Sequence, residues 1–160
     1  MSGNRGQGAV RDQGTGIGRQ MSGVGGLSGV RGMGIKSYRD LEVWKKAMDL
    51  VTQCYEITEN FPKKEIFGLA SQLQRAAVSI PANISEGHAR QHTKEFIQYI
   101  SIAYGSLAEL ETHIEIAKRL GYITADKAVD LNDKTSAIGR MLNGLRKSLE
   151  KNKDVKEGAK

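Results

Sequence analysis

Apolar residues recur every three or four positions along four segments of the chain, which is the spacing of one face of an α-helix. These segments are residues 43–61, 66–87, 96–117 and 128–149. The average repeat of about 3.5 residues favours helices that pack nearly parallel or antiparallel with a shallow supercoil. Because only short joints separate the segments, successive helices are expected to run in opposite directions. The pattern therefore predicts an all-α protein, an antiparallel up-down-up-down four-helix bundle.

Capping residues and one proline refine the boundaries of these helices. Asp40, Thr93 and Thr124 are predicted to cap the first, third and fourth helices with their side-chain oxygens. Gly121 is predicted to end the third helix. Pro81 lies inside the second segment, where we expect a kink rather than an end, because proline removes one backbone N–H and crowds the carbonyl four residues earlier.

The composition divides the chain into three parts. Of its 19 glycines, 12 precede residue 37, and a segment so rich in glycine cannot offset the entropy lost on ordering. Residues 1–36 are therefore predicted to be a disordered Gly-rich basic tail, residues 37–150 the four-helix bundle, and residues 151–160 a basic C-terminal tail. The bundle holds 15 basic and 15 acidic residues, so the formal net charge of +6 lies in the two tails.

Several classes of protein and site are excluded by what the sequence lacks. The single cysteine, Cys54, cannot form an internal disulfide and predicts a reducing, cytoplasmic location. It lies in an apolar stripe, which favours a small core residue over a nucleophile. No apolar run is long enough to span a membrane.

Neither the Glu-x-x-His pairs of a di-iron bundle nor a complete G-x-G-x-x-G loop occurs. His88 and His92 lie near a predicted joint and are expected to face solvent rather than bind a metal. We therefore expect no enzymatic activity, no metal or other cofactor, and no small-molecule substrate.

A polar stripe runs beside the apolar one on the second predicted helix. Its members are Gln72, Arg75, Ser79, Asn83, Glu86 and Arg90. Such a stripe is usually a solvated face, and the alternative is a polar network between helices or subunits, which can fix their register. We favour the network, with Arg75 paired to a carboxylate of the third helix such as Glu109 or Glu111. Asn83 or Ser79 is expected to satisfy the carbonyl that Pro81 leaves free.

The apolar surface is wider than a single bundle requires. The first helix carries a second stripe, and the third adds residues that point away from its main stripe. These extra residues include Trp44, Met48, Val51, Tyr55, Tyr99, Ile102 and Ile116. The pattern favours a broad core-facing surface, and the alternative is burial against another copy of the chain.

Four runs of residues carry a resemblance to a known family. They are Tyr38-Arg-Asp-Leu-Glu-Val-Trp44-Lys-Lys-Ala47, Gln72-Leu-Gln-Arg75-Ala-Ala-Val-Ser79-Ile-Pro81-Ala-Asn83-Ile-Ser-Glu86-Gly87, Ala103-Tyr-Gly105-Ser106-Leu-Ala-Glu109-Leu-Glu111-Thr and Ala117-Lys-Arg-Leu-Gly121-Tyr122. Over about residues 37–150, the chain resembles the four-helix-bundle family named after proteins encoded in intervening sequences of bacterial 23S rRNA genes. Ser85 and Tyr104 depart from the usual pattern of that family, and residues 1–36 have no counterpart in it.

The resemblance implies a ring-like homopentamer whose biochemical role is undefined. A related pentameric bundle, the accessory variability determinant of diversity-generating retroelements, binds nucleic acid and a reverse transcriptase. Two functions follow: a non-enzymatic oligomeric scaffold or interaction protein, which we favour, and an RNA- or DNA-binding accessory factor associated with rRNA or with a reverse transcriptase. The neutral bundle argues against a strong phosphate-binding surface. Basic residues near the helix ends are the candidate nucleic-acid contacts: Lys63, Lys64, Arg90, Lys94, Lys118 and Arg119.

Overall fold

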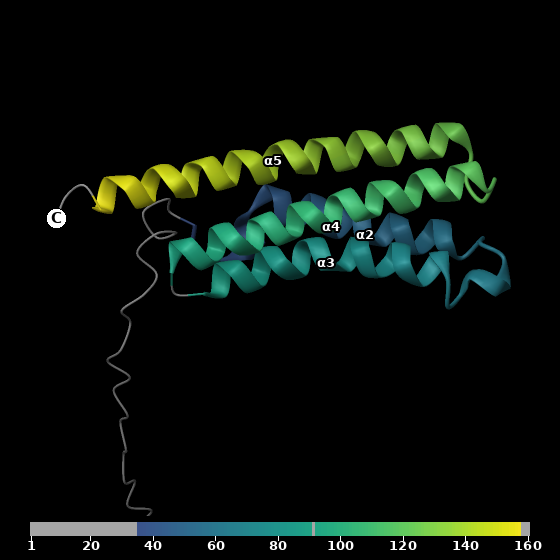
Figure 1. The fold of residues 1–160 in the computed structure, drawn as a ribbon, viewed down its shortest axis with the longest axis horizontal. Coiled ribbons are helices and arrows are strands. Elements are labelled where there is room, and N and C mark those ends of the chain that lie inside the picture. Colours follow the sequence, from purple (N-terminus) through teal and green to yellow (C-terminus); the bar gives the residue numbers. More distant parts are fainter. Residues whose placement is uncertain (1–34, 91, 158–160) are drawn as a thin grey trace, which may run out of the picture.

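The computed structural model describes residues 35–90 and 92–157, and it describes side chains as far as residue 152 (Figure 1). The predicted disorder of residues 1–36 falls outside the described residues except at Ile35 and Lys36. Residues 158–160 of the predicted C-terminal tail also lie outside them.

The described chain is all-α, as predicted. Its elements are η1 (Tyr38–Asp40), α2 (Glu42–Thr58), η2 (Lys63–Glu65), α3 (Leu69–Ala89), α4 (Thr93–Arg119) and α5 (Ala125–Glu157), where η marks a 3-10 helix. Each α-helix packs against the next, and α5 returns to contact α2, so the four helices form an antiparallel bundle (Figure 1). The α2–α3 and α4–α5 joints lie at one end, which we call the loop end. The α3–α4 joint, the start of α2 and the C-terminal end of α5 lie at the other, which we call the tail end.

The core is built from the predicted apolar series of all four helices. Burying a Leu, Ile or Phe side chain contributes about 1.5–3 kcal/mol, so these positions dominate the stability of the bundle. Thr135 is buried among them because its hydroxyl donates a hydrogen bond to the carbonyl of Asn132 (2.9 Å). The largest fully buried side chains are Leu50, Leu73, Ile80, Ile84, Phe96, Ile100, Leu110, Ile114, Leu131, Ile138, Leu142 and Leu149.

Two of the three predicted caps are wrong. Asp40 does not cap α2, because it belongs to η1 and its carboxylate turns back to accept the Ser37 N–H (3.1 Å). Leu41 takes the N-cap position of α2 without a side-chain hydrogen bond. Thr93 does not cap α4 because the helix begins one residue earlier than expected, so that Thr93 lies within the first turn and His92 precedes it.

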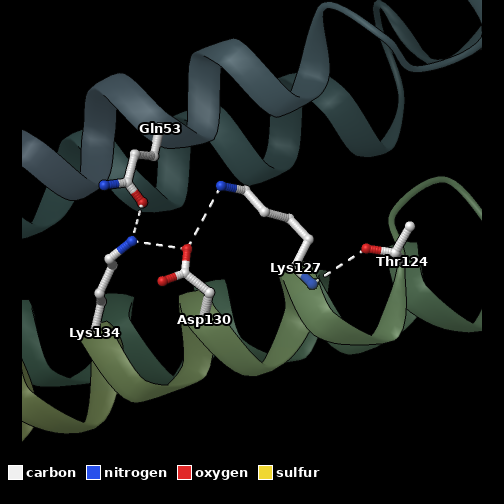
Figure 2. A network of polar contacts seen from close by, with 5 residues as sticks. All are labelled: Gln53, Thr124, Lys127, Asp130 and Lys134. Atoms are coloured by element: carbon white, nitrogen blue, oxygen red, sulfur yellow. Dashed lines mark hydrogen bonds and ion pairs between the residues drawn. The ribbon is translucent and has the colours of Figure 1, made fainter.

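The predicted end of α4 and the start of α5 are confirmed. Gly121 has a φ of 72°, a left-handed conformation that glycine adopts without strain. It lets the Tyr122 N–H bond to the Ala117 carbonyl (2.9 Å) and so satisfies a free end of α4. Thr124 then caps α5, since its hydroxyl oxygen accepts the N–H of Lys127 (3.2 Å; Figure 2).

The second and fourth predicted helices have different lengths in the structure. α3 begins at Leu69 rather than Ile66, because residues 63–65 form η2 and the Glu65 carboxylate accepts the Leu69 N–H (3.0 Å). α3 then continues through Pro81 to Ala89. α5 continues beyond residue 150 to Glu157, so the expectation of a tail from residue 151 onward is wrong for residues 151–157, which are helical. None of the helices in the described ranges combines the length and apolar character that crossing a bilayer requires.

Candidate functional site

The polar stripe of α3 forms part of the seam between α3 and α4. The hydroxyls of Ser79 and Ser106 are 2.9 Å apart across this seam. The Asn83 side-chain amide donates to both the carbonyl (2.8 Å) and the hydroxyl (2.9 Å) of Ser79. The carbonyl that Pro81 leaves free belongs to Ala77, and the expectation that Asn83 or Ser79 would satisfy it is wrong. The Asn83 amide reaches Ser79 instead, and the Ser79 hydroxyl contacts Asn83 and Ser106.

Arg75 does not join this seam. Its guanidinium donates to the Gln72 side chain (3.0 Å) on its own helix and is exposed. Glu109 lies 3.4 Å from His113, one turn further along α4. Within the described chain no ion pair joins Arg75 to Glu109 or Glu111, so the predicted contact between helices of one chain is not formed. Pairing of Arg75 with a carboxylate of another copy stays a prediction.

Glu86 and Arg90 form a second contact between α3 and α4, near the tail end. The Tyr99 hydroxyl donates to Glu86 (2.8 Å) and accepts from Arg90 (2.6 Å), and Arg90 also pairs directly with Glu86 (2.6 Å). The hydrogen bonds from Tyr99 and Arg90 hold the pKa of the Glu86 carboxyl below its usual value. Arg90, a candidate nucleic-acid contact, is thus already paired with a carboxylate of its own chain.

The six basic candidate residues do not form one patch. Lys63, Lys64, Lys118 and Arg119 lie at the loop end, whereas Arg90 and Lys94 lie at the tail end. The 27 residues of α4 separate the two groups by about 40 Å, at 1.5 Å per residue. Lys118 (2.6 Å) and Arg119 (2.8 Å) both pair with Glu115, and these contacts lower the pKa of its carboxyl.

A groove of about 340 Å³ runs between α2 and α5. Figure 2 shows the polar network that crosses it: the Lys134 ammonium donates to Gln53 of α2 (2.7 Å) and to Asp130 of its own helix (2.7 Å), and Lys127 approaches Asp130 (3.5 Å). Lys134, followed by Lys127, lowers the pKa of the Asp130 carboxyl. This site was missed from the sequence, because its residues lie on the two helices that are furthest apart along the chain.

The residues around this network give the groove an apolar floor and a rim with two unpaired carboxylates, and Lys46 at the same groove pairs with Glu42 (3.8 Å). Leu50, Ala137 and Ile138 form the floor. Asp49 and Asp133 are exposed at the rim, and neither has an ion pair or hydrogen-bond partner in the part of the chain that the structure describes.

α3 presents an outward surface with almost no charge. Only Arg75 and Glu86 are acidic or basic among its 21 residues, apart from His88. The Gln74 amide donates a hydrogen bond to the hydroxyl of Thr58 (2.7 Å), which lies one turn after Tyr55 and so continues the second stripe of α2. We call the combined surface the charge-poor face, and it comprises Ser71, Gln74, Val78, Ala82 and Ser85 of α3 with Met48 and Tyr55 of α2.

Several residues of the surplus apolar set are exposed rather than core-facing. Met48 is 41% exposed and Tyr55 is 45% exposed, both on the charge-poor face, where Val78 of α3, which is not a member of the set, is also 41% exposed. Ile102 and Ile116 of α4 are exposed as well. The interpretation of the whole set as a broad core-facing surface is therefore wrong for Met48, Tyr55, Ile102 and Ile116, while Trp44, Val51 and Tyr99 are half-buried.

The loop end carries the most exposed large apolar side chain in the described chain. Phe67 is 96% exposed, and Ile66 beside it is also exposed. The preceding residue, Glu65, is held by the Leu69 N–H and by the Tyr122 hydroxyl (both 3.0 Å), which together lower the pKa of its carboxyl. The sequence did not single out Phe67, because a loop residue has no periodicity to reveal its exposure.

Cys54, His88 and His92, the residues considered as a nucleophile or as metal ligands, lie outside the polar contacts and the groove described above. Cys54 is fully buried, and burial raises the pKa of its thiol to about 12. The expectation that His88 faces solvent is wrong: its ring is buried edge-on between Tyr38 and Phe96, whereas His92 is exposed. In the ranges 35–90 and 92–152, no group of three or more His, Cys, Asp or Glu side chains is placed to hold a metal ion.

Comparisons with known proteins agree with this fold. Residues 39–144 match the family model described as 23S rRNA-intervening sequence protein. A solved structure from Bacteroides thetaiotaomicron VPI-5482, described as a protein with unknown function from the S23 ribosomal protein family, is similar at 25% identity and a TM-score of 0.62. That similarity covers 66% of this chain and 95% of the other. No curated protein matches the chain.

Proposed function

The chain belongs to the 23S rRNA-intervening sequence protein family, and we propose that it acts as a non-enzymatic scaffold that assembles from copies of itself. The charge-poor face is the observation that carries this proposal. A surface helix of a monomeric bundle normally has charged and polar residues on its solvent side, and apolar residues there indicate that the side is covered by something else. α3 has only two charged residues at its exposed positions, Arg75 and Glu86, and it exposes Val78 and Ala82 in the single chain.

The shape and chemistry of this face favour contact with another copy. Small residues such as Ser71, Ala82 and Ser85 allow close approach, and Val78, Met48 and Tyr55 supply apolar area. Exposed contiguous apolar surface generally marks an interaction site, and most soluble oligomers are closed assemblies of identical chains. The assembly proposed here is a closed ring, with five copies as the family resemblance implies.

A pair of glutamate substitutions tests this proposal. Val78→Glu places a charge on the charge-poor face, whereas Val129→Glu places one on the exposed outer side of α5. Both valines are solvent-exposed, so neither change should disturb the folded chain. Light scattering at several protein concentrations should show a multiple of 17.5 kDa for the wild type and for Val129→Glu, and a smaller species for Val78→Glu. A wild-type mass of one chain at all concentrations would refute self-assembly.

The environments of the reactive side chains support a non-enzymatic role. A thiol with a pKa of about 12 is almost entirely protonated at neutral pH and cannot serve as an activated nucleophile. A buried reduced thiol is also compatible with the cytoplasmic location that we propose.

A second candidate function is binding of RNA or DNA as an accessory factor, with rRNA or a reverse transcriptase as associated partners. The observation that favours it is the gathering of Lys63, Lys64, Lys118 and Arg119 at the loop end. A ring would repeat this group in every copy and raise its effective affinity. The Glu115 pairs of Lys118 and Arg119 weaken the attraction to phosphate, which is why we rank this function second.

Electrophoretic shift over a salt series tests the second candidate. Binding through phosphates should weaken steeply with added salt. Replacing both Lys63 and Lys64 by Glu should weaken it further, whereas Lys147→Glu, on the exposed surface of α5, should change it little. The same series without residues 1–34 separates the bundle from the basic N-terminal segment. Absence of salt-dependent binding at low ionic strength would exclude this function.

A further inference from the structure

The α2–α3 joint exposes an apolar side chain, that of Phe67, on a backbone that hydrogen bonds hold in place. We call residues 63–67 of this joint the knob. Phe67 has almost no contact with its own chain, although exposing a phenyl ring to water is unfavourable. The backbone around it is nevertheless fixed, because Glu65 binds the start of α3 and Tyr122 of the α4–α5 joint. The Phe67 phenyl group is therefore pre-organised to bind a partner, because the backbone that carries it loses little conformational entropy on binding.

The knob also carries positive charge. Lys63 and Lys64 lie four and three residues before Phe67 and are both exposed. Neither has a hydrogen-bond or ion-pair partner among the residues that the structure describes. The surface that receives the knob should therefore offer an apolar floor flanked by carboxylates.

The groove between α2 and α5 has these properties. Its floor is apolar, and Asp49 and Asp133 stand at its rim, one from each helix, without partners in the described chain. The charges deeper in the groove already satisfy one another, because Lys134 is bonded to Asp130 and Gln53 (Figure 2). Lys46 also lines the groove, but it pairs with Glu42 one turn earlier on α2 (3.8 Å). The charges of the lining that are left without a partner in the described chain are thus the carboxylates of Asp49 and Asp133, complementary to two lysines.

We propose that the Lys63–Phe67 loop of one copy docks into the α2–α5 groove of the next copy. The Phe67 ring covers the apolar floor, and Lys63 and Lys64 pair with Asp49 and Asp133 of the neighbour. This inference rests on the proposed self-assembly and names two surfaces that join the copies. Pairs at the rim set the register of the contact, while the buried ring supplies most of its strength.

The groove between α4 and α5 is a poorer receptor for this loop. Its lining includes both Glu111 and Arg140, and neither has an ion-pair partner among the described residues, so one charge would attract the lysines and the other would repel them. In the α2–α5 groove the lysines of the lining, Lys46 and Lys134, are instead paired with carboxylates of the same chain. A free amine or another small cation would satisfy Asp49 and Asp133, but it would leave Phe67 exposed. A second copy satisfies both surfaces at once.

The proposed contact joins two different surfaces, which has a consequence for the symmetry of the assembly. Every copy carries one knob and one groove, so each can give and receive one contact. Such head-to-tail contacts produce a closed ring when the rotation between neighbours closes, rather than a twofold dimer. The charge-poor face begins next to Phe67, at the N-terminal end of α3, and can pack against the same neighbour.

Charge reversal with rescue is the decisive experiment. Lys64→Glu and Asp133→Lys should each weaken assembly about fivefold or more, since like charges then meet at the rim. The double variant should recover most of the wild-type affinity, because the pair is restored in the opposite sense. Phe67→Ser should weaken assembly about 30-fold, the loss typical of a central aromatic anchor. Leu120→Ser, which removes another exposed apolar side chain of the loop end, is the matched control and should assemble normally.

Cross-linking gives an independent readout. Under mild oxidation, a chain with Phe67→Cys mixed with a chain with Ala137→Cys should form a two-chain disulfide that neither chain forms alone. The native Cys54 is buried and does not compete. Circular dichroism checks that each variant keeps its helices. The docking would be overturned, and self-assembly kept, if the wild type is oligomeric but Phe67→Ser does not weaken assembly, the double charge reversal does not restore it and no cross-link forms. A monomeric wild type would overturn both.

Discussion

Replacing Gly87 by alanine should destabilise the bundle, although alanine is the better helix former. Gly87 lies in α3 against α4, and a Cβ atom built on it would be 2.6 Å from the Tyr99 Cβ and 2.7 Å from the Phe96 ring. Ordinary contact begins near 3.4 Å. The Tyr99 Cβ is bonded directly to the backbone of α4 and cannot rotate away, so the two helices must separate.

The magnitude follows from two opposing contributions. Gly→Ala inside a helix gains up to about 1 kcal/mol. Overpacking a closely packed core typically costs about 1–3 kcal/mol, and contact with a backbone-linked atom belongs at the upper end of that range. We therefore expect a net loss of about 1–2 kcal/mol in the free energy of unfolding. For a domain of this size the melting temperature should fall by roughly 4 °C per kcal/mol.

Gly105 supplies the matched control. It is also inside a helix, but apart from its neighbours in the chain and the backbone of its own helix, no atom lies within 4 Å of a Cβ built there. Gly105→Ala should therefore gain up to about 1 kcal/mol from helix propensity alone. Urea unfolding followed by circular dichroism, at one fixed protein concentration because the protein is expected to assemble, measures both changes. The packing argument fails if Gly87→Ala is as stable as the wild type, or if Gly105→Ala loses more than Gly87→Ala.

Buried and capping residues give three further tests. Cys54 should react with iodoacetamide at mildly alkaline pH only after unfolding in urea, because burial raises its pKa to about 12; rapid reaction of the folded protein would contradict its position. Burial lowers the pKa of His88 in the folded chain despite the nearby Asp40, so the unfolded chain binds the proton more readily. Stability should therefore decline as the pH falls below about 6.5, and His88→Gln should remove that decline in a melting-temperature profile. Thr124→Ala should cost about 1 kcal/mol of unfolding free energy, whereas Thr124→Ser, which keeps the capping oxygen, should cost much less.

The helices of the bundle are predictable from the sequence because their determinants are local. The apolar spacing of each segment defines which side is buried, and Gly121 and Thr124 act on the neighbouring turn alone. The wrong predictions of helix caps and of the end of the last helix also have local causes. Asp40 and Thr93 are suitable cap residues that lie one position away from the actual N-cap, where another turn or another start of the helix competes. Residues 151–157 lack an apolar stripe, yet the helix continues because their charged residues are mostly good helix formers.

The candidate sites are less predictable because they depend on how the helices are rotated against one another. The spacing of Arg75 places it on the polar stripe, but only the packing shows that Ser79, and not Arg75, reaches α4. Asp49 and Asp133 lie far apart in the sequence, so their common rim appears only when α2 and α5 are side by side. The surplus of apolar residues could be read from the sequence, whereas the division between core and exposed face could not.

The position of α2 has a consequence for the order in which the chain folds. α2 packs between α3 and α5, and α5 is synthesised after the other three helices of the bundle. A nascent chain that ends after α4 has one open side, lined by Leu50 of α2 and Leu107 of α4, until residues 128–149 emerge from the ribosome. Contacts between the two ends of a sequence close late, because the loop-closure entropy must be overcome first. Ribosome-bound chains that stop near residue 124 should therefore be far more sensitive to protease than chains that include α5.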